Sequence, residues 1–204
     1  MSSIRDRNQH LILEAASEEF AVHGFAAARI DAIAARAGLP RPNVFYYFRN
    51  KRQLYVAVLD LVMQPLLLAS RRLAADLHPE QALPRYLKAK AEVARQHPHA
   101  TRVWLKEMLH GARHLPGNSA EELRQSVRQN LACLSAWMDR GLIARACPQH
   151  LLLFLWSTPL ATLRFGEAPG SASQVRPSRA STQAMVDMLL RSLRPDTLAV
   201  GKTA

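Results

Sequence analysis

The segment that most restricts the fold of this chain lies between residues 24 and 54. It reads GFAAARIDAIAARAGLPRPNVFYYFRNKRQL and holds two short helical patterns on either side of a glycine. From residue 30 to residue 37, apolar side chains recur at i, i+3, i+4 and i+7, the spacing of one helix face. Gly38 follows where a helix end favours a left-handed residue, and Pro42 stands where a first helical turn tolerates a missing N–H. This layout is typical of a helix-turn-helix, whose second helix enters the DNA major groove.

The second of these helices carries side chains that suit contact with DNA. Arg41 and Asn43 lie at its start; arginine pairs with guanine and asparagine with adenine through two hydrogen bonds each. Tyr46, Tyr47 and Lys51 follow with groups that can reach phosphate oxygens, and such contacts fix the register of a protein on DNA. The alternative interpretation is an ordinary helical hairpin with solvated charges.

The N-terminal fifty or so residues resemble the DNA-binding domain of the TetR family of bacterial repressors. The resemblance implies a three-helix helix-turn-helix domain at the N-terminus, followed by a larger helical domain for ligand binding and dimerisation. The matching residues are Leu13, Ala15, Ala16, Phe20, Gly24, Ile33, Ala34, Ala37, Gly38, Tyr47, Phe48, Lys51 and Leu54.

Several positions depart from the family pattern. Ala28 stands where the family often has Thr, and Arg29 beside it is the candidate for the phosphate contact that the hydroxyl would make. Pro40 replaces the usual Ser or Thr before the recognition helix, which removes an N-cap worth roughly 1 kcal/mol. Taken together, the predicted DNA contacts are Arg29, Arg41, Pro42, Asn43, Phe45, Tyr46, Tyr47 and Lys51.

The charge of the chain favours a polyanionic partner. The formal net charge is +11, from 27 basic and 16 acidic residues, and a basic protein attracts nucleic acid. Residues 1–55 contribute only +3 of this charge, so the excess does not point to the helix-turn-helix. An arginine-rich composition that reflects a GC-rich genome remains an alternative explanation.

Helical periodicity continues along the rest of the chain, with no convincing strand, and the predicted fold class is all-α. The expected domains are residues 1–55 for DNA binding and 56–196 for effector binding and dimerisation, with a flexible tail at 197–204. Pro65 falls inside the fourth helical pattern and is expected to kink or break it. A capping box at residues 119–122 is expected to open a long helix, and residues 168–178 are expected to form a loop.

The sequence indicates a cytoplasmic location. The longest apolar run, residues 151–163, is too short to span a membrane, and no signal peptide is apparent. Cys133 and Cys147 match no metal-binding spacing and are expected to be reduced thiols.

The second domain resembles more closely the effector domain of the pyrimidine-utilisation regulators within this family. Residues 157–163 depart from that subgroup, because they lack the polar groups that read a pyrimidine, so the ligand is not expected to carry over with the fold. The residues that carry this resemblance are Asn43, Tyr46, Tyr47, Phe48, Tyr86, Lys90, Glu92, Arg95, Pro98, Ala100, Arg102, Glu107, Met108, Gly111, Trp137, the run Pro148–Leu151 and Trp156.

The helices that enclose the effector in relatives hold several aromatic and polar residues here. An apolar cavity with a few polar groups that fix orientation is the usual form of a ligand site, although such residues at helical spacing are commonly part of a core. The predicted pocket residues are Tyr86, Lys90, Trp104, Glu107, Met108 and Trp156.

Residues 151–165 form a helical pattern that is apolar nearly all round and must be buried on most sides. It suits either the core of one subunit or, together with residues 181–194, the interface of a homodimer. Leu189 is the residue expected at that interface. A two-fold dimer reads two half-sites on DNA and so multiplies specificity.

A metal site and an enzyme active site are the weaker hypotheses. His110 and His114 lie one helical turn apart, with His97 and His99 nearby, but no Cys or paired carboxylate supports them. No phosphate loop or nucleophile motif is present, so no cofactor is expected. The favoured function is a ligand-responsive repressor that binds a near-palindromic operator, and the alternative is an architectural DNA-binding protein without an effector.

Overall fold

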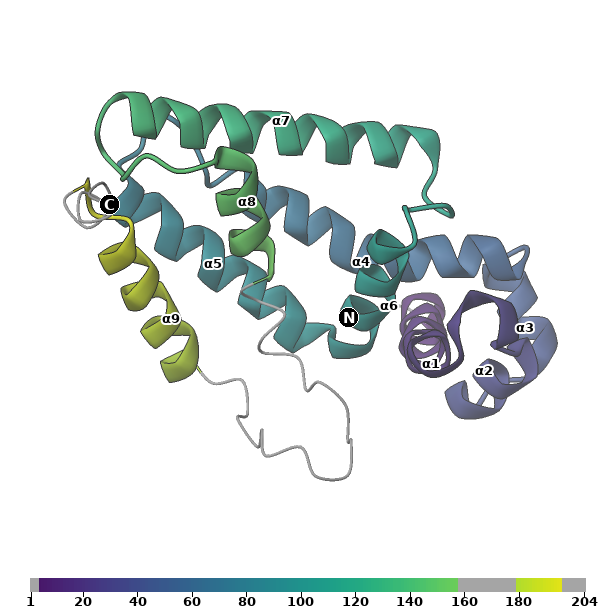
Figure 1. Cartoon of the computed structure of the whole chain (residues 1–204). Coiled ribbons are helices and arrows are strands. Elements are labelled where there is room, and N and C mark those ends of the chain that lie inside the picture. Colours follow the sequence, from purple (N-terminus) through teal and green to yellow (C-terminus); the bar gives the residue numbers. More distant parts are fainter. Residues whose placement is uncertain (1–3, 158–178, 196–204) are drawn as a thin grey trace. The chain divides into compact units, whose positions relative to one another are not determined.

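A computed structural model of the chain describes residues 4–157 and 179–195. Every helix or strand within these residues is an α-helix, and the prediction of an all-α fold is confirmed. The expected loop at 168–178, the apolar residues 158–165 and the tail at 197–204 lie outside the described residues. The helices, labelled in Figure 1, are α1 (Ile4–Ala27), α2 (Ile30–Ala37), α3 (Arg41–Tyr47), α4 (Lys51–Ser70), α5 (Pro79–Gln96), α6 (Pro98–Leu109), α7 (Gly117–Asp139), α8 (Pro148–Ser157) and α9 (Arg179–Ser192).

The chain divides into two compact units. The first unit comprises residues 1–64 and 97–120, and the second comprises residues 65–96 and 121–204. The expected domain boundary at residue 55 falls inside α4, which begins in the first unit and ends in the second. Helix α6 belongs to the first unit, where it packs against α1.

The first unit has a tightly packed apolar core. Its largest fully buried side chains come from α1, α2 and α4, and their removal from water is the main force that holds these helices together. They are Ile12, Phe20, Ile33, Leu54, Leu59 and Met63.

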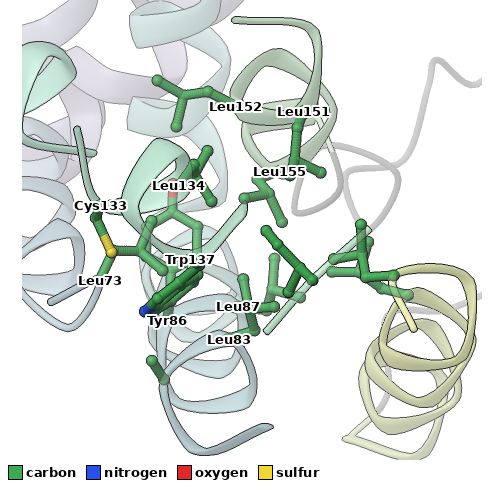
Figure 2. Close-up of a cluster of buried hydrophobic side chains, with 14 of the residues drawn as sticks. Leu73, Leu83, Tyr86, Leu87, Cys133, Leu134, Trp137, Leu151, Leu152 and Leu155 are labelled. Atoms are coloured by element: carbon green, nitrogen blue, oxygen red, sulfur yellow. The ribbon is translucent and has the colours of Figure 1, made fainter. Parts of the chain in front are cut away.

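The second unit is built around a core to which α5, α7, α8 and α9 all contribute. Figure 2 shows side chains of α5 and α7 meeting those of α8 in this core. Trp137 is fully buried there and donates its indole N–H to the carbonyl oxygen of Leu77 at 3.0 Å. Helix α9 packs against α5 and closes the unit from another side.

Two helices have boundaries that differ from those predicted by local sequence signals. Helix α4 runs as one helix through Pro65, rather than ending there. Helix α7 begins at Gly117, before the predicted capping box, because the N–H of Ala120 already bonds to the carbonyl oxygen of Pro116 at 2.9 Å.

Among the described residues, α4 is long and apolar enough to cross a membrane by length and composition alone. The core helix of a globular protein passes the same test. Five apolar side chains of α4 are at most 1% exposed: Leu54, Val58, Leu59, Val62 and Met63.

Candidate DNA interface and effector site

The turn between α2 and α3 has the geometry that its sequence predicts. Gly38 adopts the left-handed conformation, with φ 66° and ψ 28°. Its N–H bonds to the carbonyl oxygen of Ala35 at 3.1 Å, and the N–H of Leu39 bonds to that of Ala34 at 3.0 Å. These bonds satisfy the last carbonyls of α2 and redirect the chain into α3.

Helix α3 begins without a side-chain cap. Pro40 occupies the N-cap position and makes no capping hydrogen bond, as the replacement of Ser or Thr predicts. The side of α3 that faces the core is anchored by Val44 and, at its C-cap, Phe48, which are 1% and 4% exposed. The other side of this short helix is left to solvent.

The solvent side of α3 carries most of the predicted DNA contacts. Arg41 and Pro42 are exposed, and Tyr46 is 75% exposed with its ring packed edge-on against Tyr47. Phe45 is 39% exposed. Asn43 and Tyr47 are half-buried, and Arg29 is exposed just before α2.

Arg41 is held in place by its neighbours in the protein. Its guanidinium lies 3.2 Å from a carboxylate oxygen of Asp31 on α2 and 5.5 Å from the centre of the Phe45 ring. All three side chains are exposed, so the ion pair contributes little to stability. Its effect is to orient the guanidinium on the outer side of the helix-turn-helix.

Lys51 has a partner inside the first unit. Its ammonium group donates to the carbonyl oxygen of Ala26 at 2.9 Å and lies 5.2 Å from the centre of the Phe25 ring. Lys51 therefore ties the start of α4 to the end of α1, next to the predicted DNA-binding surface.

Helix α1 makes polar contacts with both ends of α2. Arg29 is the N-cap residue of α2 but makes no side-chain cap. Instead, the backbone N–H of Arg29 donates to the carboxylate of the buried Glu19 at 3.1 Å. Arg36 at the other end of α2 pairs with Glu18 at 2.7 Å. These contacts from α1 hold α2 without the hydroxyl that Ala28 lacks.

Two exposed basic residues near α3 were not among the DNA contacts predicted from the sequence. Arg49 and Arg52 flank Lys51 at the start of α4 and face solvent. The turn that carries them is well defined, because the N–H of Gln53 bonds to the side chain of Asn50 and the N–H of Arg49 bonds to the side chain of Gln53, both at 2.8 Å. The basic run RNKR at residues 49–52 is the sequence signal that could have identified both of them.

Three of the predicted pocket residues meet in the second unit. The Lys90 ammonium donates to the Tyr86 hydroxyl oxygen at 3.0 Å and lies over the rings of Tyr86 and Trp156, 4.9 and 5.4 Å from their centres. Trp156 and Ser70 also lie near the Tyr86 hydroxyl, where their donor groups partly oppose the rise of its pKa. We call Ser70, Tyr86, Lys90 and Trp156 the polar cluster. Ser70 was not predicted, because nothing local marks it.

Burial dominates the electrostatics of the polar cluster. Tyr86 is fully buried and Lys90 is 6% exposed. Burial lowers the pKa of Lys90 to about 7, and it raises the pKa of Tyr86 well above its usual value. An amine with a pKa this close to neutral is a frequent feature of functional sites.

The other three predicted pocket residues lie on α6 in the first unit. Trp104 is 7% exposed and Met108 is half-buried. Glu107 is 3% exposed, and its carboxylate accepts hydrogen bonds from the Tyr55 hydroxyl at 3.0 Å and the His114 backbone N–H at 2.6 Å. The His114 ring nitrogen Nδ1 lies 3.0 Å from the same carboxylate.

The charge of Glu107 is stabilised by these neighbours. Burial alone would raise the pKa of Glu107, but the hydrogen bonds from His114 and Tyr55 outweigh burial and hold the pKa below its usual value. The rings of Tyr55 and His114 also pack against Phe25, with ring centres 5.1 and 4.4 Å away. Glu107 thus joins α4, α6 and the end of α1 within the first unit. We call Tyr55, Glu107 and His114 the Glu107 network.

No metal site is seen in the part of the chain that the structure describes. No three His, Cys, Asp or Glu side chains are grouped there in a way that could hold an ion. His114, one of the histidines considered from the sequence, is engaged with Glu107 instead.

The helices expected to form a dimer interface carry apolar side chains on their surface. Leu153 and Phe154 on α8 are 63% and 50% exposed, and Met188 on α9 is 58% exposed. Leu189 is only 4% exposed and belongs to the core of its own unit. Leu189 therefore packs within its own unit instead of facing outward, because the sequence does not fix which face of α9 packs on α5.

Two family models match adjacent parts of the chain. Residues 12–58 match the bacterial regulatory proteins of the tetR family, and residues 59–167 match the C-terminal region of YcdC-like proteins. Together they cover the helix-turn-helix and most of the helices that follow.

Relatives of known name agree with the family models. The chain is 34% identical over 147 residues to the HTH-type transcriptional regulator RutR of Escherichia coli K12, covering 72% of this chain and 69% of the relative. It is 32% identical over 145 residues to the HTH-type transcriptional repressor SCO4008 of Streptomyces coelicolor, covering 71% of each. The similarity to RutR supports the predicted pyrimidine-utilisation subgroup.

A solved structure confirms the fold. The ketosteroid transcriptional regulator KstR2 of Mycobacterium tuberculosis superposes with a TM-score of 0.76 at 17% identity, covering 95% of this chain and 97% of that one. Proteins of this family are regulators and not enzymes. The helix-turn-helix, the family models and the relatives lead to one conclusion: this chain belongs to the TetR family of DNA-binding transcriptional regulators.

Proposed function

We propose that the protein is a ligand-responsive repressor that binds a near-palindromic operator as a homodimer in the cytoplasm and leaves it when a small molecule binds. The observation that carries the ligand response is the polar cluster, a buried amine and two aromatic rings in the core of the second unit. Residues 1–55 would bind DNA, and residues 56–196 would bind the effector and dimerise.

The exposed side of α3 supports the DNA-binding part of the proposal. Asn43 and Arg41 would read base edges, and Tyr46, Tyr47, Pro42 and Phe45 would fit against the groove and backbone. Arg29 and Lys51 would contact phosphates, together with Arg49 and Arg52, which face solvent beside Lys51. In a dimer the two copies of α3 would reach half-sites about 34–36 Å apart.

Helix α4 supports a route from the effector to DNA. At its C-terminal end, Ser70 lies near the Tyr86 hydroxyl of the polar cluster. Towards its N-terminal end, Tyr55 bonds to Glu107 and Lys51 bonds to Ala26. A ligand that displaces Ser70 would move a helix whose other end is fastened beside α3. An effector acts only if it binds the two conformations of the protein unequally.

Fluorescence anisotropy with operator DNA tests this proposal. DNA that the protein selects from a random pool would be labelled and titrated with the full-length protein, with and without a panel of metabolites. The expected result is a two-fold symmetric consensus and at least one compound that weakens binding several-fold to hundredfold. Selection of unrelated sequences would refute operator recognition.

An architectural DNA-binding protein without an effector is the second candidate. It predicts DNA binding that depends weakly on sequence and that no metabolite changes. The large helical unit beyond the helix-turn-helix argues against a minimal architectural protein. The buried Lys90 also favours the first candidate, because a buried amine lowers stability and is better explained by a binding role.

A further inference from the structure

We propose that the polar cluster recognises a small organic carboxylate, whose oxygens accept hydrogen bonds from Lys90 and balance its charge. This inference rests on the proposed function, since it names the chemical class of the effector. It follows from the numbers of hydrogen-bond donors and acceptors in the cluster and from the absence of a negative charge beside Lys90 among the described residues.

Donors outnumber acceptors in the polar cluster. A phenolic oxygen has two lone pairs and one O–H; Lys90 donates to the Tyr86 hydroxyl, and Trp156 and Ser70 bring further donors close to it. An indole and an ammonium group have no lone pair to offer in return. Lys90, Trp156, Tyr86 and Ser70 together carry six N–H and O–H donors, whereas the Tyr86 and Ser70 oxygens offer four lone pairs, so some donors of the cluster remain without an acceptor within it.

Lys90 has the largest unused capacity. Its ammonium group carries three N–H donors, of which one is directed at Tyr86. The aromatic faces of Tyr86 and Trp156 attract the positive charge, as in other cation–π contacts, but they are weak partners for a buried ammonium. Two donors of Lys90 remain for a ligand.

No charged group of the protein balances Lys90 in the described part of the chain. Burial is the one cause of its lowered pKa, with no contribution from a carboxylate. An isolated buried charge is unfavourable unless it is paired and hydrogen-bonded. A monoanion supplies one negative charge and two acceptor oxygens at once, whereas phosphate would bring more charge than one lysine can balance.

A second buried donor lies on the neighbouring helix. Asn130 on α7 is 2% exposed, and its side-chain nitrogen has no partner. It precedes Leu134 and Trp137 by one and two helical turns on the same face of α7, and both of these residues pack in the core that contains Tyr86. The core thus presents unused N–H groups on α5 and on α7, which again suits a ligand rich in acceptors.

Two other buried titratable groups of this core stay neutral near neutral pH. Burial raises the pKa values of both Tyr86 on α5 and Cys133 on α7, in the second case to about 11. On the helices of this core, the other described charged or titratable side chains are exposed, apart from the half-buried Glu92 on α5. The exposed ones are Glu80, Arg85, Lys88 and Arg95 on α5, Glu121, Glu122, Arg124, Arg128 and Asp139 on α7, His150 on α8, and Asp187 and Arg191 on α9. A change of ligand affinity between pH 6.5 and 8.5 that is lost in Lys90→Gln would therefore report on Lys90.

Calorimetry with pairs of carboxylates and their neutral amides tests the proposal. The pairs are acetate and acetamide, benzoate and benzamide, phenylacetate and phenylacetamide, and octanoate and octanamide, with uracil as a neutral acceptor. At pH 6.5 we expect at least one carboxylate to bind the full-length protein at least tenfold more tightly than its amide and than uracil. We expect its affinity to fall by roughly tenfold for each pH unit above 7, as Lys90 loses its proton.

Variants assign the effect to Lys90. Lys90→Met is expected to lose the preference for the carboxylate, and Lys90→Gln, which keeps donors without a charge, is expected to lose the pH dependence. Lys88→Met removes an exposed lysine from the same helix and is expected to behave as the parent protein. Equal binding of acid and amide in every pair, or full carboxylate binding by Lys90→Gln, would overturn the proposal.

Operator release, measured separately, distinguishes this inference from the proposed function. If a neutral metabolite releases the operator and no carboxylate binds, the protein is ligand-responsive but the anion inference fails. If a carboxylate binds through Lys90 and operator affinity does not change, the anion site stands and the effector function fails.

Discussion

Lys90 has an environment that opposes folding, and this is informative about its role. A buried ammonium group loses its hydration, and the pKa of Lys90 falls to about 7 as a result. In the unfolded chain a lysine has a pKa near about 10.4. Between these values the unfolded state binds more protons, so the contribution of Lys90 to stability rises with pH. A residue that lowers stability at neutral pH is easier to explain by function than by packing.

Lys90→Met should therefore stabilise the protein at pH 7. Methionine fills a similar volume without the buried amine, and a gain on the order of a few kcal/mol is expected, or roughly 2–4 °C of melting temperature for each kcal/mol. The gain should be largest at and below pH 7 and smaller at pH 10, where the folded lysine is neutral and the unfolded lysine has begun to lose its proton. Lys88→Met is the matched control, because Lys88 is exposed on the same helix. Melting curves at the two pH values would contradict this account if Lys90→Met were the less stable protein at pH 7.

Lys51 and Asn43 should affect DNA binding in different ways. Replacing Asn43 by Ala should relax base preference at one operator position, at a cost of roughly 1–3 kcal/mol for the preferred base. Replacing Lys51 by Ala should weaken binding to all sequences, and if Lys51 contacts phosphate the slope of log affinity against log salt should fall by about one. Anisotropy titrations at several salt concentrations measure both effects.

The control for Lys51 follows from its partner in the protein. Because the Lys51 ammonium donates a hydrogen bond to the carbonyl oxygen of Ala26, Lys51→Ala also removes a contact between the start of α4 and the end of α1. Weaker binding with an unchanged salt slope would assign Lys51 a purely structural role. Arg49→Ala is the comparison, because Arg49 is exposed close to Lys51 in the chain. If Arg49 contacts phosphate, this variant should lower the slope of log affinity against log salt by about one.

At the scale of elements, Glu107 connects α6 to α4. Its network is formed by residues far apart in sequence: Tyr55 and Glu107 are separated by 52 in residue number. The hydrogen bonds keep Glu107 ionised, since its pKa lies below the usual value despite burial. For a carboxyl with a lowered pKa, the stabilising contribution is present above the unfolded pKa and is lost as pH falls through the folded pKa.

Glu107→Gln should weaken this connection. The amide keeps the shape but loses the charge-assisted bonds to Tyr55 and His114, with an expected cost of about 1–3 kcal/mol at pH 7. Between pH 5 and pH 3 the variant should lose stability less steeply than the parent protein. Glu121→Gln is the control: Glu121 is exposed on α7 and paired with Arg124 and Arg128, and exposed pairs contribute little to stability. Chemical denaturation at pH 7 and at acid pH measures the difference, and equal pH dependence of parent and Glu107→Gln would contradict the role of the network.

Local signals were enough to predict the helices and the helix-turn-helix. Gly38 takes the left-handed conformation that the pattern requires. The spacing of apolar residues also identified the buried face of α2 correctly. The partners of Glu107 and Lys51 could not be predicted in this way, because each lies on another helix. The same reason explains Leu189, since only packing on α5 decides which face of α9 is buried.

At the scale of the whole molecule, α4 is one of three places where the chain passes between the unit that holds the polar cluster and the unit that holds the helix-turn-helix. It contributes Ser70 to the second unit and Tyr55 to the first. Pro65, the first residue of the second unit, removes one backbone N–H from the middle of this helix, and a proline inside a helix weakens it locally. A pivot at Pro65 would let a ligand change the direction of one half of α4 while each unit keeps its own core.

Dimerisation is the remaining requirement for reading a two-fold operator, and α8 and α9 are the helices proposed to provide it. Leu153 and Met188 expose large apolar side chains that a second subunit would cover. Glutamate at either position would place an unpaired charge in a desolvated contact, which costs several kcal/mol. Leu153→Glu and Met188→Glu should therefore raise the dimer dissociation constant by about a hundredfold or more.

Light scattering and operator titrations test this requirement together. Both variants should be monomeric at micromolar concentration and should bind a full operator no more tightly than a single half-site. Leu109→Glu is the matched control, because Leu109 is 84% exposed on α6, away from α8 and α9 in sequence and in the first unit. It should remain dimeric and keep its preference for the full operator. Dimers of unchanged stability in Leu153→Glu and Met188→Glu would move the interface to another surface, whereas a monomer that still prefers the full operator would show that the two half-sites are read without a preformed dimer.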